Sequence, residues 1–242
     1  MLSLLYLLIS FLPVLIYIGV IWATTEPNSI NIKSSFTHFF SGIISVAIIF
    51  GIMALMPGYQ RLLPISHTWA IFIFSFIQIA FIEEICKFIS YIIGENIRGE
   101  ESIVYDKPIS TMFYCGITAL GFSFIENVIY ALQFGGDVLI TRSLFSMLLH
   151  FLSGMIMGYW IALSKLPMKI KNKSPLEIFL FTKPELKKVT YYLIGILCAV
   201  LLHGFYDFNI FSGGHISSNY LILFSGFIAN YLAAKNLQPK SK

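Results

Sequence analysis

Several ionisable side chains stand inside long apolar stretches of this sequence, where a buried charge is costly. The candidates for chemistry are three glutamates and two histidines: Glu83, Glu84, Glu126, His150 and His203. Carboxylates and imidazoles transfer protons, activate water molecules and bind metal ions. We therefore expect this set to carry acid–base or metal-assisted chemistry, or to relay protons across a membrane.

Helical spacing relates these residues to charged neighbours. Glu83 and Lys87 are four residues apart with the acid first, so they can pair on one helix face, and Lys87 is then a structural, neutralising group. Glu84 is rotated by one residue and is expected to be the freer carboxylate. His203 and Asp207 are also four residues apart, so Asp207 either orients the imidazole or acts directly.

Two further residues are candidates for supporting roles. Asn127 follows Glu126 and can hydrogen-bond to a neighbouring helix or to a reacting group. Arg142 stands at the end of its apolar stretch, where it can guard the mouth of a cavity or extend to the membrane surface.

The energetic cost of these charges indicates how they must be arranged. A single charge at the centre of a bilayer costs roughly 2.5–3.5 kcal/mol. The five formal charges in apolar stretches would together cost up to roughly 15 kcal/mol if each stood alone in lipid. These side chains must therefore face one another or a wet cavity. Counting a rise of about 1.5 Å per residue places that cavity toward the outer half of the membrane.

The composition indicates a membrane protein. The chain has 242 residues, of which 57% are hydrophobic and 12% are charged, whereas a soluble domain carries about 25% charged residues. Its mean hydropathy is +0.80. So little charge cannot cover the surface of a soluble protein, which excludes a globular cytosolic enzyme, a disordered chain and an ordinary nucleic-acid binder. The apolar stretches are too long and continuous for a transmembrane barrel.

We predict an all-α, polytopic transmembrane helical bundle of about seven spans, because a spanning helix needs about 20 mostly apolar residues. The predicted spans are residues 2–23, 35–56, 68–94, 109–132, 139–164, 188–211 and 217–236. Residues 1–67 form two N-terminal helices without a motif, 68–211 a catalytic core, and 212–242 the last helix and a basic tail. The three cysteines lie in apolar stretches without CxxC spacing, which indicates unpaired core residues.

The distribution of basic residues predicts the orientation in the membrane. With seven spans, nearly all of the 16 lysines and arginines fall on one side. The other side holds Arg61 and Arg142. Because basic loops stay in the cytoplasm, we expect the N-terminus outside and the C-terminus in the cytoplasm.

Four sequence motifs follow one another on successive predicted spans: Phe81-Ile82-Glu83-Glu84-Ile85-Cys86-Lys87, Gly121-Phe122-Ser123-Phe124-Ile125-Glu126-Asn127, His150, and His203 with Asp207. Asp106-Lys107-Pro108 forms the approach to the second of these spans. In this order they resemble the PrsW family of intramembrane proteases, with its EExxK and GFxxxEN motifs. The resemblance covers about residues 80–210. Ile82 stands where some members extend the acidic run.

This resemblance implies an intramembrane peptidase, distantly related to the CAAX-processing and bacteriocin-processing (CPBP) membrane proteases. It also implies regulated proteolysis of membrane-anchored proteins, including anti-sigma factors, in the cytoplasmic membrane of a prokaryote. The expected partners are a membrane-anchored protein substrate and the lipid bilayer, and no nucleic acid.

Peptide hydrolysis needs an activated water, a proton donor and stabilisation of an oxyanion, and two arrangements of these residues can supply them. In the first, which uses no metal, Glu84 or Glu83 is the general base on a water. His150 or His203 polarises the carbonyl, and Asn127 donates to the oxyanion.

In the second arrangement, His150 and His203 bind Zn²⁺ together with Glu84 or Glu126, and an open position is left for water. A remaining glutamate is then the base. The sequence has no HExxH motif, so the ligands would come from different helices. We favour a glutamate-driven site without an obligatory metal and keep zinc as the alternative.

A proton-coupled transporter or channel is the competing class, because buried acids and histidines also form proton relays. The sequence shows neither an inverted repeat nor paired helices broken by Gly or Pro, which transporters often have. Lys87 could form a Schiff base with retinal, but it stands beside two glutamates rather than in an apolar pocket. A scaffold or receptor would leave the intramembrane charges unexplained. The peptidase is therefore our preferred function.

Overall fold

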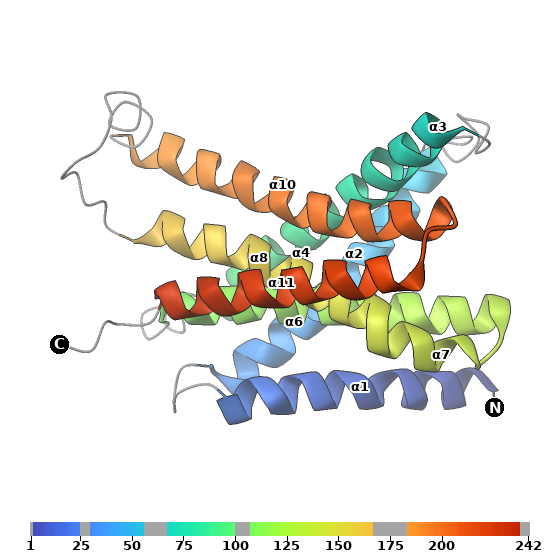
Figure 1. The fold of residues 1–242 in the computed structure, drawn as a ribbon. Helices are drawn as coiled ribbons and strands as arrows, with labels where there is room; N and C mark the ends of the chain where they lie inside the picture. Colours follow the sequence, from blue (N-terminus) through green and yellow to red (C-terminus); the bar gives the residue numbers. More distant parts are fainter. Residues whose placement is uncertain (1, 25–29, 56–66, 100–106, 167–182, 238–242) are drawn as a thin grey trace.

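The computed structural model describes residues 2–24, 30–55, 67–99, 107–166 and 183–237 (Figure 1). These residues are helical apart from short turns, and this part of the chain contains no strand. The helices are α1 (Leu2–Thr24), α2 (Ile32–Leu55), α3 (Thr68–Ile73), η2 (Phe74–Phe81), α4 (Ile82–Arg98), α6 (Pro108–Phe134), α7 (Val138–Thr141), η3 (Arg142–Ser146), α8 (Met147–Lys165), α10 (Pro184–Phe211) and α11 (Ile216–Leu237).

Seven helical stretches are long and apolar enough to cross a membrane, which confirms the predicted number of spans and the all-α class. Two of them are composite. The π-helix η2 joins α3 to α4 in one stretch, Thr68–Arg98, and the π-helix η3 joins α7 to α8 in another, Val138–Lys165. Asp106 and the basic residues between 167 and 182 lie outside the described residues, and the orientation of the termini stays a prediction.

One helix runs past its predicted end because its last turn is held by charge pairs. The third span was expected to end at residue 94, but α4 continues to Arg98. Glu95 in this last turn lies 3.1 Å from His38 Nε2 of α2 and 3.3 Å from Lys165 Nζ of α8. Because partners on neighbouring helices satisfy its carboxylate, the charge does not end the helix.

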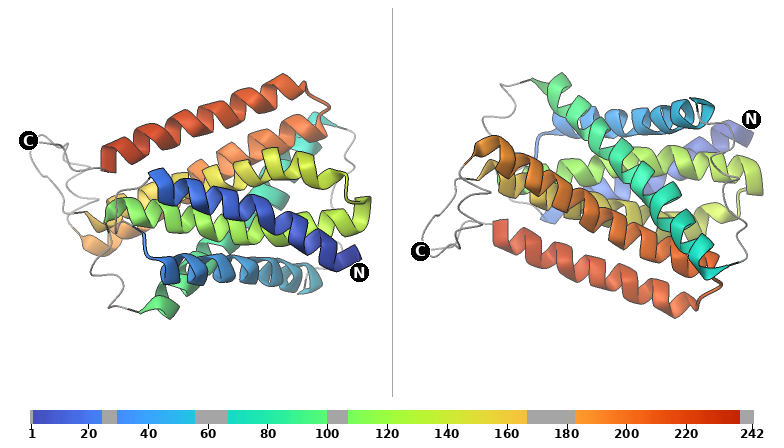
Figure 2. Two further views of the ribbon diagram at one scale, coloured as in Figure 1. Left: turned by 90° about the horizontal axis from the view of Figure 1, so that it is seen from below. Right: turned by 90° about the horizontal axis from the view of Figure 1, so that it is seen from above.

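Helix α6 forms the centre of the bundle. Its most apolar window is 72% buried, compared with 17–56% for the other spans. Helix α8 packs closely on it through glycines: a Cβ on Gly154 would lie 2.7 Å from the Cys115 carbonyl oxygen, and one on Gly158 would lie 2.7 Å from Met112 Cα. In both views of Figure 2, α11 and α2 lie on opposite flanks, with α6 and α8 between them.

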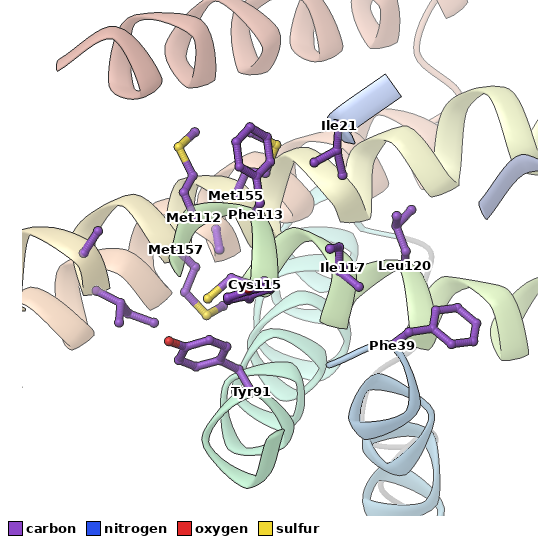
Figure 3. Packing of buried hydrophobic residues seen from close by; sticks show 14 of the residues in the cluster. Ile21, Phe39, Tyr91, Met112, Phe113, Cys115, Ile117, Leu120, Met155 and Met157 are labelled. Atoms are coloured by element: carbon purple, nitrogen blue, oxygen red, sulfur yellow. The ribbon is translucent and has the colours of Figure 1, made fainter. Parts of the chain in front are cut away.

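The apolar core gathers around α6 (Figure 3). Residues of α1, α2, α4 and α8 contact the buried face of α6, and the cluster includes Ile21, Phe39, Tyr91, Met112, Phe113, Cys115, Ile117, Leu120, Met155 and Met157. All three cysteines are free thiols, as predicted, and Cys115 belongs to this core.

Helices α2 and α4 meet at one end and diverge at the other, as both views of Figure 2 show. They meet at Gly94, where a Cβ would lie 2.6 Å from His38 Nδ1 and 2.9 Å from Ser41 Oγ. Away from this contact, α2 stays packed on α6, whereas η2 packs on α10. The divergence leaves space between α2 and η2, and the ionisable residues border this space.

Candidate active site

Glu84 is fully buried at the point where α4, α8 and α10 meet. Its Oε1 atom accepts hydrogen bonds from Lys87 Nζ at 2.9 Å and from Ser153 Oγ at 3.2 Å. The same oxygen lies 2.8 Å from His203 Nδ1. We expected Glu84 to be the freer of the two adjacent carboxylates, and that expectation was wrong. The face of α4 that carries Glu84 and Lys87 points into the bundle.

Glu83 is the carboxylate of the pair that faces the cavity. Its Oε2 lies 3.5 Å from Lys87 Nζ, the predicted i,i+4 pair, and 3.8 Å from His203 Nε2. Lys87 is thus shared between both glutamates, and its ammonium also lies 4.2 Å from the centre of the Phe122 ring. The structure supports the structural, neutralising interpretation of Lys87.

His150 bridges two helices through its two ring nitrogens. Nδ1 lies 2.9 Å from Lys87 Nζ and Nε2 lies 2.9 Å from Glu126 Oε2. Because an ammonium group only donates, this contact assigns Nδ1 as the acceptor and leaves the Nε2 proton to be donated to Glu126. The His150 and His203 rings are perpendicular, with centres 4.9 Å apart.

His203, like His150, has a carboxylate on one of its ring nitrogens. Glu84 contacts Nδ1, while Nε2 points toward Glu83 and lies 3.3 Å from Asp207 Oδ2. The predicted contact between His203 and Asp207 is therefore confirmed. Since Glu84 already orients the imidazole, Asp207 does not have to.

A cavity of about 600 Å³ lies against these groups. Its polar wall includes Glu83, Glu126, Arg142, His150, His203 and Asp207. Glu84, Lys87 and Asn127 stand behind this wall rather than in it. The remaining lining is largely apolar, and part of it comes from α2, in the N-terminal region that carries no motif.

Arg142 is fixed at the cavity wall by residues of α6 and η3. Its Nε donates to Asn127 Oδ1 at 2.9 Å, and its Nη2 donates to Ser146 Oγ at 3.1 Å and lies 2.7 Å from Glu126 Oε2. The guanidinium also lies 3.7 Å above the Tyr130 ring. Arg142 thus borders the cavity, as expected, whereas Asn127 holds Arg142 and does not face the cavity as an oxyanion donor would.

One group of side chains in the described residues could hold a metal ion: Glu83, His150 and His203, whose ligand atoms lie within 4.8 Å of one another. Two histidines and one glutamate are a usual ligand set of catalytic zinc. Each imidazole also has a carboxylate on one ring nitrogen, Glu126 on His150 Nε2 and Glu84 on His203 Nδ1, the outer-shell arrangement typical of zinc ligands. The other nitrogen of His203 faces Glu83, whereas the other nitrogen of His150 contacts Lys87 Nζ, which would have to move for His150 to bind the ion. The residues therefore fit zinc, although we expected Glu84 or Glu126 as the carboxylate ligand. Glu84 lies behind the cavity wall with Lys87 and Ser153 on one oxygen, and Glu126 is paired with Arg142.

The sequence reasoning missed three polar participants. Ser153 and Ser146 hold Glu84 and Arg142, and their position within one helical turn of His150 was the available signal. His38, near the start of the predicted span 35–56, was not among the candidate residues, but it is fully buried, in contact with Glu95 and stacked between Tyr91 and Tyr114.

The sequence matches the family model described as "PrsW family intramembrane metalloprotease" over residues 32–232. It is 30% identical to Protease PrsW of Oceanobacillus iheyensis over 139 residues, 57% of this chain and 55% of that protein. It is 26% identical to Protease PrsW of Bacillus subtilis over 137 residues, 57% of this chain and 54% of that protein. The chain spans about half the length of these curated relatives, and no solved structure matches it. This chain belongs to the PrsW family.

Proposed function

We propose that the protein is an intramembrane peptidase that hydrolyses peptide bonds of membrane-anchored proteins, with anti-sigma-factor-like proteins among the possible substrates of regulated proteolysis. The observation that carries the proposal is the meeting of Glu83, Glu126, His150, His203 and Asp207 at one cavity between membrane-spanning helices. Relatives named Protease PrsW support it. A distant relation to the CPBP proteases also remains a proposal.

We propose that the active form binds a zinc ion through Glu83, His150 and His203, which the ligand set and the description of the family favour over the metal-free arrangement. When bound, zinc activates a water as the nucleophile and polarises a carbonyl group. Glu84 orients His203 from behind the cavity wall, and Glu126 orients His150 from within it. These two glutamates are therefore positioning residues rather than bases.

The other polar residues of the wall divide the remaining tasks. Asp207 borders the cavity 3.3 Å from His203 Nε2, which makes it the proposed general base that takes a proton from the attacking water. Arg142 is the fixed cation of the wall and faces the negative charge that develops on the carbonyl oxygen. Asn127 and Ser146 keep its guanidinium in place.

We further propose that the protein resides in the cytoplasmic membrane with its N-terminus outside, its C-terminus in the cytoplasm, and residues 68–211 as the catalytic core. The basic residues support the orientation. Helix α2, which precedes residue 68, also lines the cavity, so we propose that it belongs to the catalytic core as well.

The test uses purified protein in liposomes with a panel of single-span reporter proteins, and includes metal analysis of the active preparation. Glu83→Gln and His203→Ala are expected to abolish cleavage while circular dichroism and gel filtration stay those of the wild type. Chelation is expected to abolish activity, and zinc to restore it. Full activity in a metal-free preparation would refute the proposed zinc site, and Glu83 would then be the general base of the metal-free arrangement. Proteolysis retained by either variant would refute the site.

A further inference from the structure

On one side of the cavity, α2 and η2 face each other across it. Val46, Phe50 and Met53 of α2 line it on one side, and Phe74 and Gln78 of η2 line it on the other. Both elements belong to helices that are long and apolar enough to cross a membrane, so this side of the cavity would face the lipid.

The neighbouring walls are closed by tight contacts. Helix α2 packs against α6 at Gly42, where a Cβ would lie 1.9 Å from the Thr118 carbonyl oxygen. The element η2 is sealed to α10, because a Cβ on Gly204 would lie 2.4 Å from the Phe76 ring, and the Phe74 ring contacts Phe211 edge-on at 5.3 Å. These contacts hold α2 to α6 and η2 to α10, while α2 and η2 lie on opposite sides of the cavity. The cavity also reaches the surface beside Phe134 and Thr141, at the adjoining ends of α6 and α7.

Apolar residues at this opening line the cavity and are also exposed on the outer surface. Phe50 lines the cavity and is 54% exposed, and Met53 does the same at 37%. On the opposite edge Phe211 is also exposed and also lines the cavity. An apolar rim in front of a wall of charged groups suits an apolar chain that enters from the lipid.

The other end of α2 is anchored, so the opening can widen only away from this anchor. His38 lies 3.1 Å from Glu95 through Nε2 and 3.4 Å from Thr118 Oγ1 through Nδ1. Its ring is stacked between Tyr91 and Tyr114, with centres 5.3 and 4.9 Å away. This second polar cluster holds α2 to α4 and α6 at the end where α2 and α4 meet, and the two helices diverge from there, as Figure 2 shows.

Gln78 indicates the conformation of the entering chain. It lies in the π-helix η2, lines the cavity and precedes the catalytic Glu83 by five residues. A peptide bond must leave its helix to be hydrolysed, and inside a membrane the freed N–H and C=O groups need new partners. A side-chain amide offers both donors and acceptors. Gln78 therefore suits an extended backbone better than an intact helix.

We infer that an apolar stretch of a membrane-anchored protein enters the cavity sideways, in extended form, between α2 and η2, passing Phe50 and bonding to Gln78. This inference deepens the proposed peptidase function and rests on it. It adds the route by which such a chain reaches the site, from the lipid between two helices rather than from the water phase.

The first experiment locates the entering chain by photo-crosslinking in liposomes. The photoreactive residue p-benzoylphenylalanine replaces Phe50 or, as a matched control, Phe224, which is 60% exposed on α11 at the opposite flank. The probe is a single-span reporter protein with an apolar membrane segment. The Phe50 variant is expected to crosslink to that segment several-fold more than the control. Equal crosslinking at both positions would overturn the inference.

The second experiment blocks the opening in a variant whose three native cysteines are replaced by alanine. Met53→Cys is modified with a bulky maleimide, and Leu221→Cys on α11, which is 68% exposed, is the control. Modification at position 53 is expected to lower cleavage of the anchored reporter about tenfold and to spare a short soluble peptide with the same cut site. Equal effects on both substrates would overturn sideways entry. Crosslinking at position 50 without any cleavage would instead refute the peptidase function while the opening stands.

Discussion

The Nδ1 atom of His203 lies 2.8 Å from Oε1 of Glu84, although the two residues are 119 positions apart in the chain. A carboxylate in this place fixes the tautomer and the direction of the imidazole. It turns Nε2 of His203 toward Glu83 and Asp207 at the cavity. In the proposed site, Glu84, the second acid of the EExxK motif, therefore acts through the histidine.

This relationship predicts the effect of Glu84→Gln on metal binding. The neutral amide holds the imidazole less firmly, so zinc affinity is expected to fall about 10- to 100-fold. Competition with a chelator in the purified protein measures this change. Glu95→Gln is the matched control, because Glu95 lies on the same helix but in the His38 cluster. If both variants bind zinc like the wild type, Glu84 does not position a ligand.

Asp207→Asn tests the proposed general base. The amide keeps the shape of the side chain but cannot take a proton, so kcat is expected to fall by about 10²- to 10⁴-fold with little change in KM. Steady-state cleavage of a single-span reporter gives both constants. A loss confined to KM would show that Asp207 binds substrate instead.

Asn127→Leu tests the support of Arg142. It removes the oxygen that accepts the Arg142 Nε hydrogen bond, and a hydrogen bond to a charged group contributes about 1.5–3 kcal/mol. We expect kcat to fall roughly tenfold to a hundredfold. Asn127→Asp keeps an accepting oxygen and is expected to restore most of the rate. An Asp variant as slow as the Leu variant would contradict the positioning role.

Gly42→Ala tests the close approach of α2 and α6. The new methyl group would lie 1.9 Å from the Thr118 carbonyl oxygen, and such overpacking costs about 1–3 kcal/mol. Gly51→Ala in the same helix meets nothing within 4 Å and is expected to leave stability unchanged or slightly higher. Thermal unfolding in detergent compares the two. Equal midpoints would show that the contact at Gly42 is looser than the structure indicates.

Cysteine labelling tests the orientation. In a variant without native cysteines, Ser212→Cys in the turn after α10 is expected to react with a membrane-impermeant maleimide added to intact cells. Lys235→Cys near the end of α11 is expected to react only after the membrane is opened. Both positions are exposed in the structure, so accessibility does not separate them. The reverse pattern would invert the topology.

The amino-acid sequence by itself predicted the class of molecule and a set of candidate site residues. The length and apolarity of seven stretches predicted seven spans, since a bilayer sets the length of a crossing helix, and the structure has them. The high cost of charge in lipid singled out Glu83, Glu126, His150 and His203, which share one cavity. Spacing of four residues also predicted the pairs Glu83–Lys87 and His203–Asp207 correctly.

Only the tertiary structure decided which acid faces the cavity and what closes it. Glu83, Glu84 and Lys87 all lie in α4, and Lys87 reaches Glu83 at i,i+4 and Glu84 at i,i+3. Spacing along one helix therefore could not decide which acid faces the cavity. The contacts of Glu84 with Ser153 and His203, and of His38 with Glu95, join residues far apart in sequence. Such contacts depend on how helices cross, and local spacing cannot encode a crossing. Helix α2 carries no motif, and its residues line the cavity only because the helix packs on α6.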